Sequence, residues 1–414
     1  MLEPKMAASA SRAKDFCQEM FEKVRPLRDA EMTRLAGRKA ASGEPGGLHA
    51  WDLSFYEDML KREELDLDDE HLKQFFPLES TIDQMLEVYS QFLGLSFQRN
   101  DSLPVWHEEV VAFEVLDGTA VVGHLFLDQF PRDGKFGHQM ILPLAPCFTD
   151  GADCCVPACV NVSNLSRPEG GKPALLRWSE MKTLFHELGH AMHCICTSTR
   201  FSLLSWAWPM VPWPGGVEQD FLEVPSMALE KFACEPALLA RVSRHVRGET
   251  IGEGTLVKLQ EQDKWMKGIQ ESRFFAMALF DLEIHSRAPP YAFDGDENLT
   301  MQQLLDKIVT KYTGVPPIPG THPAASWYHM VIGYDAGYYG YGWSDVYAAD
   351  IFDMLLHSPE GLLSPETGRR LREAILSPCA SRSGNDMLTS FLGREPSTEP
   401  FLRRIGAVTE ATSR

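Results

Sequence analysis

The spacing of apolar residues predicts a chain that is mostly helical. Residues 8–40 alternate apolar and charged positions at helical spacing, and Pro26 is expected to separate two helices within this stretch. Residues 42–47 (Ser-Gly-Glu-Pro-Gly-Gly) predict a linker. From Trp51 to about Leu95 the helical pattern returns.

A different pattern begins near Pro104 and predicts a small β-sheet. Residues 110–115 and 121–126 are rich in β-branched and aromatic side chains, and they flank the hairpin signal Asp117-Gly118. Residues 159–162 could add another strand. The sheet would therefore lie directly before the next helix in the chain.

That next helix is expected to begin after the N-cap candidate Ser179 and to run to about Cys196. Residues 201–216 are rich in tryptophan and proline and predict a loop. We consider two interpretations of this loop, a surface insertion with its own aromatic cluster and a lid that contacts substrate.

Helical spacing then continues through most of the second half. Residues 218–285 predict helices with an interruption near Gly248, and residues 301–313 predict another helix. A segment rich in glycine and tyrosine follows at 333–342, before further helices towards the C-terminus.

Composition and charge narrow the possible partners. The 39 Lys and Arg residues against 58 Asp and Glu residues give a formal charge of −19, which argues against a nucleic-acid or anionic-membrane surface. The sequence contains no run of about 18 apolar residues, so we expect no transmembrane helix. Because we recognise neither a signal peptide nor a presequence, we expect a cytoplasmic location, with the mitochondrial matrix less favoured, and we expect the nine cysteines to be free thiols. We also expect a monomer.

The chemistry is concentrated in His186-Glu-Leu-Gly-His190. On a helix, positions i and i+4 share one face, so both imidazoles can point at one metal ion. That geometry suits Zn²⁺, which lowers the pKa of bound water to about 7. Glu187 could then act as general base and later pass the proton to a leaving amine.

Two histidines leave a zinc site incomplete, so a further protein ligand is expected. Glu218, Glu223 and Glu230 lie in the next helical stretch and are all candidates. His193 shares the face of His186 but lies seven residues away, about 10.5 Å along the helix axis, too far for one ion. We therefore interpret His193 as a packing or supporting residue.

Amide hydrolysis also needs hydrogen-bond donors for the developing oxyanion. A histidine and several tyrosines between 329 and 341 could provide them, because a tyrosine hydroxyl stays protonated at neutral pH. The alternative interpretation of this stretch is a tyrosine-rich packing loop. The candidates are His329, Tyr334, Tyr338 and Tyr341.

Three ordered motifs resemble the thimet oligopeptidase and neurolysin family of zinc oligopeptidases. They are FHELGHAMH at 185–193, DFLEVPS at 220–226 and GYDAGYYGY at 333–341, with weaker similarities near Trp51, at 106–108 and at 131–138. The residues of the third motif resemble the thimet oligopeptidase branch more than mitochondrial intermediate peptidase. The resemblance extends from about residue 20 to the C-terminus.

The resemblance implies a role for each candidate. It places the zinc ligands at His186, His190 and Glu223, with one zinc per chain, and the catalytic base at Glu187. It implies that His329 and the tyrosines at 334, 338 and 341 bind substrate and stabilise the oxyanion. A weaker correspondence suggests that the strand around residues 160–162 pairs with the substrate backbone.

Two features depart from the family pattern. The interval from His190 to Glu223 is 223 − 190 = 33 residues, longer than expected, and the surplus falls in the loop at 201–216. Only about 185 residues precede the first motif, so much of the helical wall that restricts such enzymes to short peptides is expected to be missing. An alternative function is therefore a weakened or inactive relative that acts as a peptide-binding module.

Together these features predict a mainly α, multihelical zincin-type metallopeptidase with a small β-sheet beside the HELGH helix. Its expected function is that of a zinc-dependent metalloendopeptidase that hydrolyses internal bonds of short peptides. We expect three regions within one peptidase: N-terminal helices and a linker (1–50), a helical segment followed by the sheet (51–178), and a helical catalytic region (179–414).

Overall fold

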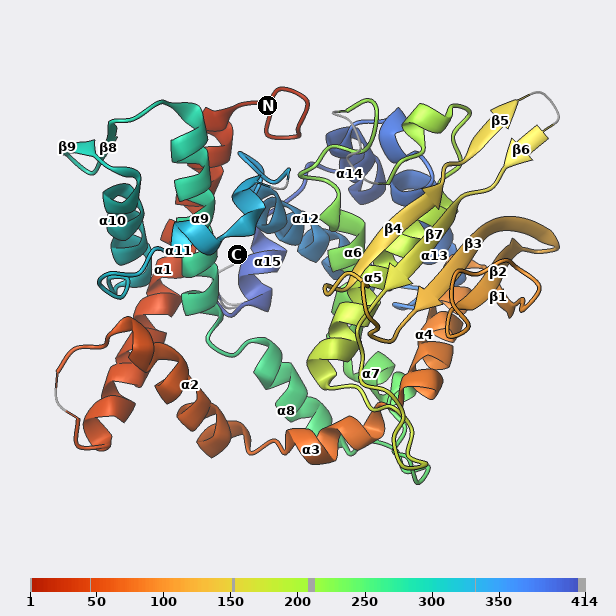
Figure 1. Ribbon diagram of the computed structural model, residues 1–414, viewed down its shortest axis with the longest axis horizontal. Coiled ribbons are helices and arrows are strands. Elements are labelled where there is room, and N and C mark those ends of the chain that lie inside the picture. The colour runs from red at the N-terminus through yellow and green to blue at the C-terminus, as the bar shows by residue number, and fades with distance from the viewer. Residues whose placement is uncertain (1, 45, 151–152, 208–212, 332, 409–414) are drawn as a thin grey trace. The chain divides into compact units, whose positions relative to one another are not determined.

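A computed structural model describes residues 2–44, 46–150, 153–207, 213–331 and 333–408. It contains two compact units, each built from stretches that are distant in sequence (Figure 1). Unit 1 comprises residues 1–66, 261–346 and 398–414, and unit 2 comprises residues 67–260 and 347–397. The three regions expected from the sequence stay a prediction.

Unit 1 is helical apart from one short hairpin. Its elements are α1 (Ala10–Ala41), α2 (Ala50–Leu65), α9 (Lys267–Ser286), β8 (Tyr291–Phe293), β9 (Asp296–Leu299), α10 (Met301–Thr313), α11 (Pro323–Ser326), the 3₁₀ turn η4 (Tyr328–Val331) and α15 (Glu399–Arg404). Helix α12 (Tyr339–Leu356) begins in this unit. The predicted helix at 301–313 is confirmed with the same bounds as α10.

Helices α1 and α9 lie side by side, and one glycine allows their close approach (Figure 1). A Cβ atom at Gly268 would lie 2.5 Å from the backbone nitrogen of Arg28, so no larger residue fits there without displacing a helix. Glu31 of α1 is buried and accepts hydrogen bonds from the N–H groups of Gly268 and Ile269 at 3.1 and 2.8 Å. This carboxylate therefore caps the first turn of α9.

The predicted break at Pro26 is wrong, because α1 continues through it as one helix of 32 residues. Pro26 is exposed, so the carbonyl that loses its intrahelical partner can be hydrated. Buried residues on the opposite face, including Phe21 and Val24, keep the helix packed on both sides of the proline. Packing thus outweighs a local penalty of about 3 kcal/mol.

Unit 2 is built on a five-stranded sheet with the order β1-β2-β3-β7-β4 (Figure 1). The β3–β7 pair is parallel and the other pairs are antiparallel. The predicted hairpin around Asp117-Gly118 is confirmed as the β2–β3 connection, and Gly118 has a φ of +61°. The strands are β1 (Ser96–Arg99), β2 (Val111–Asp117), β3 (Ala120–Asp128), β4 (Met140–Ala145) and β7 (Ala158–Val162), with a separate hairpin of β5 (Phe148–Asp150) and β6 (Asp153–Cys155).

Helices complete unit 2. They are α3 (Asp69–Leu72), α4 (Leu78–Leu93), α5 (Trp178–Cys196), α6 (Glu223–Glu230), α7 (Pro236–Val242), most of α8 (Glu253–Asp263), the later part of α12, α13 (Pro365–Leu371) and α14 (Gly384–Leu392). The predicted interruption near Gly248 is confirmed, since this residue lies between α7 and α8.

Helix α5 packs on the sheet and carries the HELGH motif. It contacts β3, β4 and β7, and a Cβ atom at Gly123 of β3 would lie 2.9 Å from Ile195 of α5. The predicted N-cap at Ser179 is wrong, because the helix begins at Trp178 after Arg177. Glu180 accepts a hydrogen bond from the Arg177 N–H at 2.7 Å, so its carboxylate caps the helix start instead. The prediction of a mainly α chain with a small sheet is confirmed.

Candidate active site

The structure brings His186, His190 and Glu223 together in unit 2. Their ligand atoms all lie within 4.8 Å of one another. One carboxylate oxygen of Glu223, Oε2, lies 3.1 Å from His186 Nε2 and 2.9 Å from His190 Nε2. The two imidazoles come from successive turns of α5, whereas the carboxylate begins α6. Two helices thus converge on one point.

Glycine in the motif makes this convergence possible. A Cβ atom at Gly189 would lie 2.8 Å from the Cα atom of Ser226, so α6 can approach α5 only where the side chain is absent. Ser226 is fully buried, and its hydroxyl donates to the Glu223 backbone carbonyl at 2.9 Å and lies 3.2 Å from its Oε2. The close helix contact therefore fixes the position of the carboxylate.

The charges of the cluster are mutually dependent. Burial by itself raises the pKa of Glu223, but His190 and His186 more than compensate and hold it well below its usual range. Burial lowers the pKa of His186, whereas its hydrogen bonds to Glu223 and Glu230 raise it well above the ordinary value overall. The site therefore favours an anionic carboxylate next to positive charge.

A zinc ion fits this donor set. Two imidazole nitrogens and one carboxylate oxygen are ligands that zinc prefers, and three protein ligands are typical of catalytic sites. Bonds of about 2.1 Å at tetrahedral angles place ligand atoms about 3.4 Å apart. The observed 2.9 and 3.1 Å separations reach that spacing with small side-chain movements.

The other two glutamates considered as ligands have different partners. Glu230 contacts the far side of the His186 ring, with Oε2 3.1 Å from Nδ1. Glu218 accepts a hydrogen bond from the backbone N–H of Gly384 at 2.5 Å. Of the three candidates, Glu223 is the one that joins both histidines. The contact of Glu230 behind a ligand is a feature that the spacing alone did not reveal.

Glu187, the predicted base, lies next to the cluster and is 7% exposed. Burial raises its pKa, while the charges of His190 and His186 and the backbone N–H of Ile141 in β4 oppose that rise. The side chain is thus close enough to the two imidazoles to interact with them electrostatically. Its catalytic role stays a prediction.

His193 has the surroundings of a packing residue. Its side chain is fully buried and makes an edge-on contact with Phe221, with ring centroids 6.4 Å apart. Within the described residues, neither ring nitrogen has a hydrogen-bond partner. Burial, followed by the charge of His190, lowers the pKa of His193 to about 3, so the ring is neutral.

The four candidates of the glycine- and tyrosine-rich segment form one cluster of rings in unit 1, which we call the tyrosine cluster. His329 lies at its centre, with centroids 5.6, 5.3 and 6.1 Å from the rings of Tyr334, Tyr338 and Tyr341. The Tyr334 and Tyr341 rings stack at 5.2 Å. The sequence interpretation thus named four residues that do meet in space, although their chemical role stays a prediction.

The predicted substrate-pairing strand at 160–162 is wrong. These residues belong to β7, which is hydrogen-bonded on one side to β3 and on the other to β4, so no edge is left for a peptide. Among the described strands, β4 pairs with β7 alone and forms this edge of the sheet. Leu142 and Leu144 of β4 are exposed along it.

The tryptophan- and proline-rich loop is only partly described. Residues 208–212 lie outside the described residues, so neither interpretation of the loop is tested. The residues that flank this gap are joined, because the N–H of Val217 donates a hydrogen bond to the carbonyl of Trp206 at 3.3 Å and closes the base of the loop.

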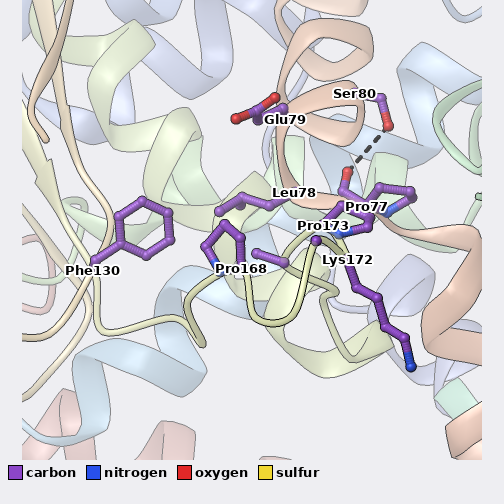
Figure 2. Close-up of a pocket in the computed structure, with 10 residues that line it drawn as sticks. Pro77, Leu78, Glu79, Ser80, Phe130, Pro168, Lys172 and Pro173 are labelled. Carbon is purple, nitrogen blue, oxygen red and sulfur yellow. Dashed lines mark hydrogen bonds between the residues drawn. The ribbon is translucent and has the colours of Figure 1, made fainter.

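A cavity of about 450 Å³ lies elsewhere in unit 2, at the start of α4 (Figure 2). Prolines and other apolar groups dominate it, and Figure 2 shows Phe130 on one side of Leu78 and Pro168. The site residues described above do not line it. The lining residues are Pro77, Leu78, Glu79, Ser80, Phe130, Pro168, Gly171, Lys172, Pro173 and Ala174.

The mainly helical fold and the candidate metal site formed by His186, His190 and Glu223 fit a metallopeptidase, and sequence comparison shows the family. The sequence model of Peptidase family M3 matches residues 1–407, and the chain belongs to this family. Among the described helices, none has the length and apolar content needed to cross a membrane.

Three named relatives are 30% identical to the chain over the aligned residues. Thimet-like oligopeptidase of Dictyostelium discoideum is 30% identical over 422 residues, covering 97% of this chain and 60% of the relative. Oligopeptidase A of Escherichia coli is 30% identical, covering 98% and 58%. Dipeptidyl carboxypeptidase of E. coli is 30% identical, covering 97% and 57%. The chain thus spans less than two thirds of the length of these relatives.

Solved structures share the fold at low sequence identity. Trypanosoma cruzi metallocarboxypeptidase 1 superposes with a TM-score of 0.51 at 12% identity, covering 95% of this chain and 69% of that one. PZ peptidase A with inhibitor 2 gives a TM-score of 0.50 at 11% identity, covering 96% and 57%. These similarities concern the fold alone.

Proposed function

We propose that the chain is a zinc-dependent metalloendopeptidase that hydrolyses internal bonds of short peptides. The observation that carries the proposal is the convergence of His186, His190 and Glu223, with Glu187 on the same helix, in a member of Peptidase family M3. These three ligands would hold one zinc ion per chain. When bound, zinc supplies a Lewis acid and makes a water nucleophile available near neutral pH.

The chain's own residues would manage the protons. Glu187 accepts a proton from the attacking water as the nucleophile approaches the scissile carbonyl, and then delivers that proton to the departing amine. The buried position of its carboxylate limits competition from bulk water. The net reaction adds one water across the peptide bond and leaves Glu187 unchanged.

Binding of the substrate is assigned to two further elements. The exposed edge of β4 is suited to pair with an extended peptide backbone by β-augmentation. For the tyrosine cluster we propose the role that the resemblance implies, in which His329 and the three tyrosines bind substrate and donate hydrogen bonds to the oxyanion. A cytoplasmic location and a monomeric state remain part of the proposal.

A second candidate is an exopeptidase, since one relative at 30% identity is named dipeptidyl carboxypeptidase. Zinc-loaded protein should be incubated with two matched peptides, one with a free and one with an amidated C-terminus, and the products identified by mass spectrometry. Internal cleavage of both supports the endopeptidase. Release of C-terminal dipeptides from the free form alone would favour the second candidate. Stoichiometric zinc without any cleavage would instead support a peptide-binding module.

A further inference from the structure

A buried carboxylate on α9 holds the backbone of the loop that carries the tyrosine cluster. Asp281 is fully buried in unit 1. Its Oδ1 accepts a hydrogen bond from the N–H of Ala336 at 3.0 Å, and its Oδ2 accepts one from the N–H of Tyr338 at 3.1 Å. The ring nitrogen Nδ1 of His285 lies 2.8 Å from Oδ1. One side chain thus accepts hydrogen bonds from two backbone N–H groups, those of Ala336 and Tyr338, in a segment that begins 55 residues later.

The residue that Asp281 holds has an unfavourable backbone conformation. Ala336 has a φ of +51°, the left-handed region that residues with a Cβ atom rarely adopt. Its N–H binds Asp281, and its carbonyl accepts a hydrogen bond from Lys5 Nζ at 3.1 Å. The surroundings therefore stabilise a conformation that this alanine would not choose alone.

The same face of α9 also positions an aromatic ring. Phe274 lies seven residues before Asp281, which places both on one side of the helix. The Phe274 ring contacts Tyr338, with centroids 5.2 Å apart, and a Cβ atom at Gly342 would lie 2.4 Å from it. Tyr338 is consequently held at its backbone by the carboxylate and at its ring by the phenyl group.

This arrangement has a consequence for the ring cluster. Tyr338 contacts His329 at 5.3 Å and Tyr341 at 5.7 Å, and it packs edge-on against Trp327 at 4.6 Å. A shift in the backbone at 336–338 would move this ring and its neighbours together. Gly333 precedes this segment and Gly337 lies within it, and glycine has a wider range of allowed backbone conformations than other residues, so an anchor has more conformations to exclude here.

We propose that Asp281, supported by His285, is a positioning residue that fixes the Tyr338 segment in the geometry needed for turnover. The inference rests on the proposed function, because it assumes that the tyrosine cluster contacts substrate. Asp281 itself touches neither substrate nor metal in this account. It acts through two backbone amides.

The first test measures the anchor independently of activity. Asp281→Asn keeps one carbonyl acceptor but turns an NH₂ group towards an amide donor. Amide hydrogen exchange in peptides spanning 334–341 should rise about tenfold or more in this variant. The matched control is Glu283→Gln on the same helix, which loses ion pairs with Lys14 and Arg287 and should leave exchange in this segment unchanged.

The second test measures the consequence for catalysis. Asp281→Asn should lower kcat about tenfold with less than a threefold change in KM and unchanged zinc content, whereas Glu283→Gln should match wild type. In a Tyr338→Phe background, Asp281→Asn should reduce kcat less than threefold further, because the hydroxyl that the anchor positions is already absent. Equal, multiplicative losses in both backgrounds would indicate a general structural effect and overturn the proposal.

The outcomes distinguish a failure of the proposed peptidase function from a failure of the Asp281 anchor. If wild type fails to cleave peptides, the proposed function is wrong, but the exchange experiment still tests the anchor. Unchanged exchange in Asp281→Asn would show that the anchor does not exist. If Asp281→Asn does not fold, His285→Gln removes the supporting partner and should raise exchange about threefold. Unaltered exchange in that variant would equally refute the proposal.

Discussion

The candidate metal site (His186, His190 and Glu223) and the tyrosine cluster position their side chains in different ways. In unit 2, His186 and His190 are fixed by the regular geometry of one helix, and Glu223 by a close helix contact. In unit 1, the tyrosine cluster is carried by turns and the start of α12, so the order must come from outside the segment. The comparison shows that two packed helices can position a candidate metal site, whereas a site carried by turns needs an anchor from another element.

Each cluster nevertheless has a carboxylate behind it. Glu230 contacts the Nδ1 side of His186 and thereby orients a side chain, while Asp281 accepts hydrogen bonds from two amides and orients a backbone. The first arrangement is common behind metal-binding histidines, because it fixes the ring and its tautomer. The second acts on a segment that contains Gly337, where the backbone has more allowed conformations to restrict.

Removing a ligand should have the largest effect. Glu223→Gln replaces an anion between two imidazoles with a neutral amide, so zinc should fall well below one per chain and peptide cleavage by at least about 1,000-fold. Metal analysis after dialysis and a fluorogenic peptide assay measure both. Glu218→Gln is the matched control and should retain its zinc. A Glu223→Gln protein with full zinc and wild-type cleavage would show that the ligand is misassigned.

Weakening the support behind the cluster should have an intermediate effect. Glu230→Gln removes the negative charge next to His186 Nδ1 but leaves all three ligands, so zinc affinity should fall about 10- to 100-fold while the stoichiometry stays at one. Competition with a chromophoric chelator measures the affinity. An unchanged affinity would mean that the contact between Glu230 and His186 is incidental, and the parallel with Asp281 would no longer hold.

The smallest expected effect concerns stability and pH. Burial raises the pKa of Glu218 from 4.5 to about 7. Because the folded state binds this proton more tightly, the stabilising contribution is complete below about pH 4.5 and is lost as pH rises through about 7. Glu218→Gln stays neutral, so at pH 8 its Tm should exceed that of wild type by about 2–4 °C, with the difference vanishing near pH 5.

Thermal unfolding at several pH values with zinc in excess measures this difference. A gap between the two proteins that is constant from pH 5 to pH 8 would mean that the carboxyl of Glu218 does not titrate in this range.

Local patterns predicted the parts of the molecule that depend on nearby residues. Helix α10, the β2–β3 hairpin and the end of α5 at Cys196 follow from periodicity and turn residues within a short window. The candidate metal site could also be predicted from the sequence, since two of its three residues lie on one helix. Their i, i+4 spacing places both imidazoles on the same face of that helix.

Most of the errors and omissions involve partners outside the local sequence window, and the N-cap wrongly placed at Ser179 is the local exception. Pro26 does not end α1, because packing along the helix outweighs the local penalty. Residues 160–162 do not form an edge, since β7 pairs with β3 on one side and with β4 on the other. Asp281 was not recognised because its two amide partners lie 55 and 57 residues away, and nothing in its own neighbourhood indicates them.

The central claim is that Glu187 is the base of a zinc peptidase whose metal is held by His186, His190 and Glu223. The most direct test is Glu187→Gln, with zinc content and peptide cleavage measured on the same preparation. The account predicts one zinc per chain, as in wild type, and a fall in kcat of about 100- to 10,000-fold. Wild-type cleavage by a zinc-loaded Glu187→Gln protein would contradict it.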